Sequence, residues 1–252
     1  MFSEDWDLDR LNREAFEVIR KLEDEGIAKY FSVPGENFSL PASANIETAE
    51  HIVVVCSGYP EHAGVWSYTL LDKSFEAPEW FEKTSMEPYF RNLYDTDTGL
   101  IALNPHAEVL KQIPDETLEI YLFQLQRLYE YLCFTRAQQV KLVLLGFSLG
   151  GEVVLRFLQT YPRYTEFTNG LILIDPVPPR TGRQNMSPEL SELVDKACFY
   201  GVSDSEGRPE KLAAFTQKIL NITPEVFSCQ FHGEMPNLVW PRIFQALPAM
   251  FT

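Results

Sequence analysis

The segment Gly146–Gly150 reads GFSLG and carries the clearest chemical signal, because a serine between two such glycines is a nucleophile motif. An apolar run over 140–145 precedes it and a helical pattern over 149–161 follows it. On a sharp strand-to-helix turn, the serine hydroxyl projects above the sheet, and the glycines allow the turn to be tight. The pattern therefore predicts Ser148 as a nucleophile, with the amide of Leu149 donating to a developing oxyanion.

A serine hydroxyl is a weak nucleophile and needs a base, which in turn needs an acid to orient it. With this motif, the chain order is serine, then acid, then histidine. His232 is the only histidine after Ser148, so it is the predicted base; a surface or packing histidine is the alternative. Of the earlier histidines (His51, His62 and His106), we expect His106 to line the crevice; an exposed position without a role is the alternative.

Asp175 is the predicted acid because it directly follows the apolar run 171–174. The carboxyl ends of parallel strands share one edge of a sheet, so its side chain would point into the crevice that holds the serine. Asp175 could instead cap a turn with Pro176. The competing carboxylates are Asp195, Asp204 and Glu234.

The second donor to the oxyanion should come from the loop 57–64, which follows the apolar run 51–56. Gly58 or Tyr59 would supply a backbone N–H group. A loop rich in small residues also suits an ordinary turn.

Short apolar runs alternate with helical patterns along the chain, which predicts a mostly parallel sheet with helices on both faces. We expect one domain over 1–252. Residues 180–222 show helical stretches and no clear strand, so they predict a small helical cap, with Phe199 and Tyr200 lining an acyl pocket. The expected strands are 27–33, 51–56, 100–103, 140–145 and 171–174, and the expected helices are 5–25, a long one from 114, 149–161 and a proline-interrupted one over 237–250.

Ser148, Asp175 and His232, in this order and with the early CSG motif at 56–58, resemble the α/β-hydrolase superfamily. A narrower resemblance is to the Arb-type domain, which is named after an argonaute-binding chaperone subunit and is appended to some fungal histone deacetylases. The segments that carry it are 64–66 (GVW), 88–90 (PYF), 147–151 (FSLGG), 232–234 (HGE) and 241–244 (PRIF). The first resemblance implies a serine esterase or thioesterase, and the second implies an interaction module.

Composition narrows the classes of function. The chain has 252 residues and a net charge of −15, so it has no excess of cations to displace counterions from nucleic acid, and it should be repelled by anionic membranes. Its four cysteines form no CxxC pair, which argues against a zinc site and favours a reducing compartment. The acidic N-terminus lacks the apolar core of a signal peptide, so we expect an intracellular protein, cytoplasmic or nuclear.

Together these patterns predict a cofactor-free and metal-free hydrolase that cleaves a small acyl substrate through an acyl-enzyme on Ser148. The alternative is a non-catalytic module, for which the acidic charge would suit a basic protein partner. Segment 95–99 (DTDTG) resembles the start of a calcium loop and a phosphatase motif, but it lacks the remaining calcium ligands and a preceding strand, so a polar turn is favoured.

Overall fold

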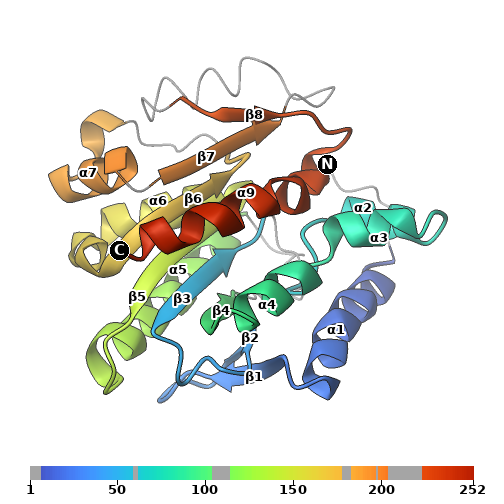
Figure 1. Cartoon of the computed structure of the whole chain (residues 1–252), viewed down its shortest axis with the longest axis horizontal. Helices are drawn as coiled ribbons and strands as arrows, with labels where there is room; N and C mark the ends of the chain where they lie inside the picture. Colours follow the sequence, from blue (N-terminus) through green and yellow to red (C-terminus); the bar gives the residue numbers. More distant parts are fainter. Residues whose placement is uncertain (1–6, 59–61, 104–113, 178–182, 197, 204–222) are drawn as a thin grey trace.

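The computed structural model describes residues 7–58, 62–103, 114–177, 183–196, 198–203 and 223–252. Within them, an eight-stranded sheet has the order β1-β2-β4-β3-β5-β6-β7-β8 (Figure 1). β2 pairs antiparallel with β1 and β4, and every pairing from β4 to β8 is parallel, which confirms the predicted mostly parallel sheet. The strands are β1 (Ala28–Ser32), β2 (Ser39–Ser43), β3 (His51–Cys56), β4 (Thr98–Ala102), β5 (Lys141–Phe147), β6 (Thr168–Ile174), β7 (Cys198–Ser203) and β8 (Glu225–Phe227).

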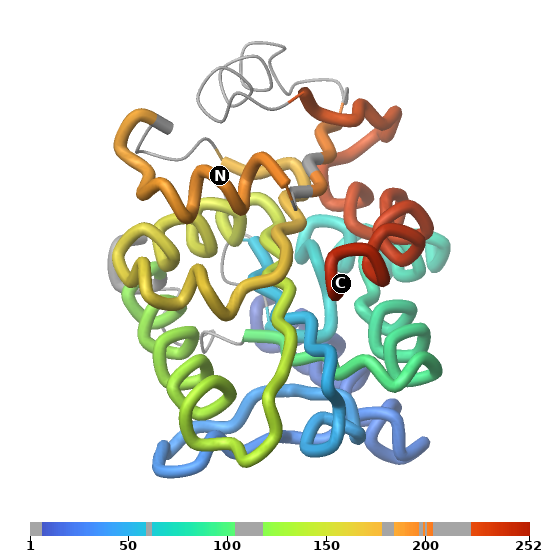
Figure 2. Tube along the Cα trace, turned by 60° about the vertical axis from the view of Figure 1, so that its left-hand side comes forward, coloured from blue at the N-terminus to red at the C-terminus, as the bar shows by residue number. Residues whose placement is uncertain are grey.

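Helices cover both faces of the sheet, as Figure 2 shows for α5 and α6 on one side and α4 and α9 on the other. The helices are α1 (Leu8–Asp24), α2 (Tyr68–Ser74), α3 (Glu79–Thr84), α4 (Glu87–Tyr94), α5 (Pro114–Glu130), α6 (Leu149–Thr160), α7 (Pro188–Lys196) and α9 (Met235–Met250). A π-helical turn, Tyr131–Thr135, extends α5. None of the described helices has the length and apolar character needed to cross a membrane.

Alternating side chains of the central strands divide the core into two layers. In β3, Ile52 and Val54 pack with α5 and α6, whereas Val53 and Val55 pack with α1, α4 and α9. All four are fully buried, which is the pattern of a parallel strand covered on both faces. The strands whose carboxyl ends carry the candidate site are therefore packed between two apolar layers.

The structure corrects the interpretation of 180–222 as a helical cap without a strand. Residues 188–196 form α7, but 198–203 form β7, which pairs with β6 and extends the sheet. β8 follows at the edge of the sheet. β8 is a short, mostly exposed edge strand, whereas β7 is a buried strand whose sequence, CFYGVS, is divided by Gly201. Residues 204–222 lie outside the described residues.

The closing helix is not interrupted at its prolines. α9 contains Pro241 and Pro248 inside one continuous helix. Both prolines face solvent, where water can satisfy the carbonyl groups that they leave unbonded, while Trp240, Ile243 and Leu247 are buried. Packing of this apolar face outweighs the local cost of the prolines.

Candidate active site

Ser148 lies on the predicted sharp turn between β5 and α6. Its backbone has φ 54° and ψ −119°, a conformation that non-glycine residues rarely adopt and that costs about 1–3 kcal/mol. Three backbone hydrogen bonds hold the strain: the Ser148 amide donates to the Ile174 carbonyl (3.0 Å), and the Ser148 carbonyl accepts from Gly151 (3.1 Å) and Val177 (2.9 Å). The turn is therefore clamped to the end of β6.

The glycines around Ser148 are required by close contacts. A Cβ atom on Gly146 would lie 2.5 Å from the Gly150 carbonyl oxygen, and one on Gly150 would lie 1.9 Å from the Cys56 carbonyl oxygen. A Cβ atom on Gly151 would lie 2.4 Å from Cβ of Pro176. The motif therefore brings the ends of β3, β5 and β6 together around the serine.

Asp175 follows β6 directly, as predicted, and its side chain is only 2% exposed. Its amide donates to the Gly201 carbonyl of β7 at 2.7 Å, and its φ is 46°. The carboxylate oxygen Oδ2 lies 2.6 Å from Nδ1 of His232. Asp175 and His232, 57 residues apart in the sequence, thus form the acid–imidazole pair that the sequence predicts.

His232 begins a short 3₁₀ turn, His232–Glu234, just before α9. Its ring stacks on the ring of Phe147, with a centroid distance of 4.7 Å and an interplanar angle of 29°. A Cβ atom on the next residue, Gly233, would lie 2.5 Å from Cβ of Ser67, so the turn is docked closely on the start of α2. His232 is therefore held against the residue that immediately precedes Ser148.

Two of the competing carboxylates are in other environments. The Glu234 side chain accepts from the Phe231 amide at 3.0 Å and forms an ion pair with Lys83 at 3.2 Å. Asp195 is exposed on α7. Asp204 lies outside the described residues.

The structure records no hydrogen bond between the Ser148 hydroxyl and His232. Ser148 is half-buried, and the His232 side chain is 36% exposed. Nucleophile–base hydrogen bonds are often long or poorly aligned without substrate and tighten in the Michaelis complex. The arrangement brings acid and imidazole into contact and places both beside the serine.

Gly58, in the loop predicted to supply an oxyanion donor, lies against Ser148. A Cβ atom on Gly58 would lie 3.2 Å from Cβ of Ser148. The buried Tyr121 of α5 supports this loop, because its hydroxyl donates to the Gly58 carbonyl at 3.4 Å and lies 3.2 Å from Oγ of Ser57. The sequence gives no signal for this role of Tyr121, which depends on packing between α5 and the end of β3. Leu149 begins α6, where its amide can serve as the other donor.

Four of the predicted oxyanion and pocket residues are not described or lie in the core. Tyr59 and His106 are outside the described residues, as is the side chain of Tyr200. Phe199 is 7% exposed and packs in the apolar layer beside Phe227, at a centroid distance of 6.4 Å. Across the described ranges, no three His, Cys, Asp or Glu side chains gather as they would to hold a metal ion.

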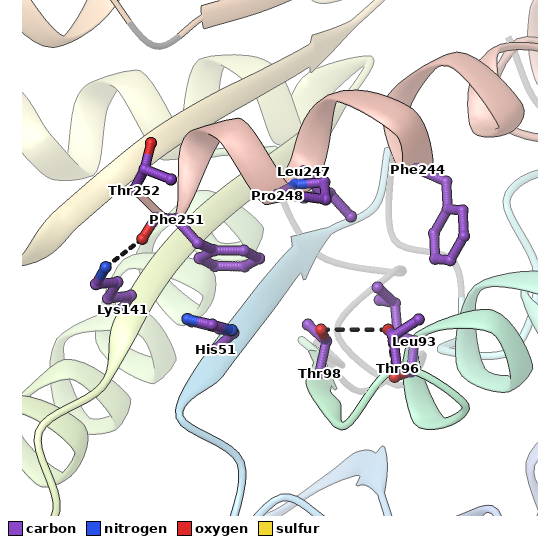
Figure 3. A pocket seen from close by; sticks show the side chains of 10 residues that line it. All are labelled: His51, Leu93, Thr96, Thr98, Lys141, Phe244, Leu247, Pro248, Phe251 and Thr252. Carbon is purple, nitrogen blue, oxygen red and sulfur yellow. Dashed lines mark hydrogen bonds between the residues drawn. The ribbon is translucent and has the colours of Figure 1, made fainter.

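A cavity of about 470 Å³ lies at the amino ends of the central strands, at the opposite end from Ser148 (Figure 3). His51, Thr98 and Lys141, the first residues of β3, β4 and β5, form one wall, and Phe244, Leu247, Pro248 and Phe251 at the C-terminal end of the chain form another. Because Ser148 lies at the carboxyl ends of the strands, this cavity is separate from the candidate site.

Comparison with known proteins gives evidence at the level of fold. No family model matches the chain, and no curated protein sequence matches it. The solved structure of the histone deacetylase Clr3 aligns over 100% of this chain, with a TM-score of 0.59 and 12% identity; the chain spans 41% of that protein. A histone deacetylase from Saccharomyces cerevisiae aligns over 96% of this chain and 97% of its own, with a TM-score of 0.55 and 14% identity.

A hormone-sensitive lipase from a metagenome library aligns over 100% of this chain and 94% of its own, with a TM-score of 0.57 and 11% identity. At such low identities these likenesses establish the fold alone, and the narrower Arb-type resemblance stays a prediction. The strand order, the serine turn and these neighbours together show that the chain has the α/β-hydrolase fold.

Proposed function

We propose that the protein is a serine hydrolase that cleaves a carboxylic ester or thioester. The observation that carries the proposal is the 2.6 Å contact between Asp175 Oδ2 and His232 Nδ1, located beside the strained serine turn. A carboxylate on Nδ1 selects the tautomer that carries its proton there, which leaves Nε2 as the acceptor for the serine proton.

In the proposed reaction, Oγ of Ser148 attacks the acyl carbonyl while Nε2 of His232 takes the hydroxyl proton. The resulting oxyanion is stabilised by the amides of Leu149 and of Gly58 or Tyr59. The tetrahedral intermediate collapses, the alcohol or thiol leaves with the proton from Nε2, and an acyl-enzyme remains on Ser148. Water, deprotonated by His232, then releases the carboxylic acid and regenerates the serine.

The test is hydrolysis of p-nitrophenyl esters and of an acyl thioester of matched chain length. We expect turnover by the wild-type protein and a loss of at least ~10³-fold in Ser148→Ala. Ser39→Ala is the matched control, since it removes an exposed hydroxyl on β2. Absence of turnover of every ester and thioester by wild-type protein would contradict the proposal.

A second candidate function is a non-catalytic protein-interaction module on the same scaffold. Two observations favour it: the net charge of −15, which suits a basic partner, and the alignment of the whole chain with 41% of the histone deacetylase Clr3. Binding to a basic peptide that weakens with salt and is unchanged in Ser148→Ala would support this function. Binding that requires Ser148 would not.

A further inference from the structure

Ser203, the last residue of β7, lies beside the candidate acid. β6 and β7 run parallel, with Ile174 opposite Gly201, and the Asp175 amide continues this ladder by donating to the Gly201 carbonyl. Ser203 therefore reaches the same edge of the sheet as Asp175, one strand farther from the serine turn. Its side chain is buried, with a residue exposure of 7%.

Ser203 donates to both oxygens of the Asp175 carboxylate. Its hydroxyl lies 2.6 Å from Oδ2, and its amide nitrogen lies 3.3 Å from Oδ1. Oδ2 is also the oxygen that contacts Nδ1 of His232, at 2.6 Å. One carboxylate oxygen is thus shared by the imidazole and the Ser203 hydroxyl, while the other is held by the backbone of β7.

We infer that Ser203 is a positioning residue that fixes the rotation of the Asp175 carboxylate and thereby the orientation of the His232 ring. Asp175 is buried, so its charged form needs hydrogen-bond donors to compensate for lost water. Two donors on different oxygens also define the plane of the carboxylate, and the Ser203 hydroxyl is the donor on Oδ2, the oxygen that His232 contacts. Ser203 acts through Asp175 and is not assigned any contact with substrate.

The consequence for catalysis rests on the proposed function, but the positioning itself does not. A hydrogen bond to a charged group contributes enough that its loss should lower kcat roughly 10- to 100-fold in Ser203→Ala. The KM should change little, because the hydroxyl is directed at Asp175. Ser203→Thr retains the hydroxyl and should restore most of the kcat.

The deciding measurement is proton NMR of the His232 Nδ1–H group, which needs no enzymatic activity. In the wild-type protein and in Ser203→Thr, we expect a downfield resonance protected from exchange with water. In Ser203→Ala, the backbone amide still donates to Oδ1, but Oδ2, the oxygen that accepts the Nδ1 proton, loses its second donor. The same proton should therefore exchange at least ~10-fold faster. Assignment of the resonance is checked by its loss in His232→Ala.

Ser43→Ala is the matched control for a merely structural effect. Ser43 is fully buried and its hydroxyl accepts from the Leu100 amide at 2.9 Å, but it lies on β2, away from Asp175. This variant should lower the melting temperature without changing the exchange of the His232 proton. Unchanged exchange in a folded Ser203→Ala protein would overturn the inference. If the wild-type protein hydrolyses nothing, the proposed function fails, while the NMR result still decides the role of Ser203.

Discussion

Two histidines stack on phenylalanine rings, one at each end of the central strands of the sheet. His232 stacks on Phe147 at the carboxyl ends of the strands, with centroids 4.7 Å apart and an angle of 29°. His51 stacks on Phe251 at the amino ends, with centroids 4.5 Å apart and an angle of 20°. The ring geometry is nearly the same, so stacking alone cannot distinguish a catalytic imidazole from a structural one.

The two histidines differ in what surrounds the ring. His232 has the Asp175 carboxylate on Nδ1 and the strained Ser148 turn beside it. Among the described residues, no carboxylate forms an ion pair with His51, whose neighbours include Lys141 and Thr98 at the wall of the 470 Å³ cavity. Stacking holds an imidazole in place, and in the proposed function it is the Asp175 carboxylate and Ser148 that give the His232 ring a chemical role. The first prediction below tests this difference directly, and the later ones test the packing, backbone strain and reactivity of the residues around it.

The largest expected effect is on catalysis when each histidine is removed. His232→Ala should lower kcat/KM for ester hydrolysis by ~10³-fold or more, since the serine loses its base. His51→Ala should leave it within about twofold of wild type, because His51 is at the other edge of the sheet. Steady-state kinetics with a p-nitrophenyl ester measure both. Equal losses of kcat/KM in the two variants would contradict the difference in role between His232 and His51.

The next largest effect is on stability, and it compares Gly150, at the carboxyl ends of the strands, with Gly99, near the amino ends. Gly150→Ala should lower the free energy of unfolding by more than ~3 kcal/mol or prevent folding, because the new Cβ atom would lie 1.9 Å from the backbone carbonyl of Cys56. In Gly99→Ala, the closest atom is Cδ1 of Ile46 at 2.8 Å, which can move, so about 1–3 kcal/mol is expected. Urea denaturation measures the two values. A smaller loss for Gly150→Ala would contradict the close backbone packing at the candidate site.

A smaller effect concerns backbone strain. Ser148→Gly should raise the free energy of unfolding by about 1 kcal/mol while abolishing hydrolysis, because glycine adopts positive φ without a Cβ clash. Asp97, before β4 at the other edge, also has φ 54°, but aspartate tolerates this region, so Asp97→Gly should change stability by only a few tenths of a kcal/mol. Thermal and urea unfolding test the pair. Destabilisation by Ser148→Gly would show that the turn stores no relievable strain.

The last expected effect, which concerns reactivity rather than stability, is at Cys56, a cysteine at the carboxyl ends of the strands. Burial raises the pKa of the Cys56 thiol far above its ordinary value, so the reactive thiolate is scarce at neutral pH. Iodoacetamide at pH 8 should therefore alkylate Cys56 at least ~10-fold more slowly in the folded protein than in the unfolded chain. Peptide mass mapping measures the rate. Rapid alkylation in the native state would mean that this edge is open in a way that the structure does not show.

The sequence predicts much of the candidate site because local rules govern it. Ser148 and Asp175 each follow an apolar strand, and strand ends converge at one edge of a parallel sheet. His232 could be inferred from chain order as the only late histidine. These inferences need no knowledge of which strands are neighbours.

Ser203 and Tyr121 could not be predicted, since their roles depend on neighbours far away in the sequence. Ser203 meets Asp175 only because β7 pairs with β6, and the sequence of β7, CFYGVS, is divided by a glycine and has a single β-branched residue, so it is not recognised as a strand. Tyr121 contacts the loop after β3 only because α5 packs across that face of the sheet. The sequence predicts the helix over 237–250 but not its continuity through Pro241 and Pro248, because tertiary packing overrides the local preference of proline.

The central claim is that His232 activates Ser148, and labelling with a fluorophosphonate tests it most directly. Intact mass and peptide mapping should show a single adduct on Ser148 in the wild-type protein, no adduct in Ser148→Ala, and labelling slowed at least ~10³-fold in His232→Ala. A native wild-type protein that remains unlabelled, or one labelled equally fast without His232, would contradict the claim.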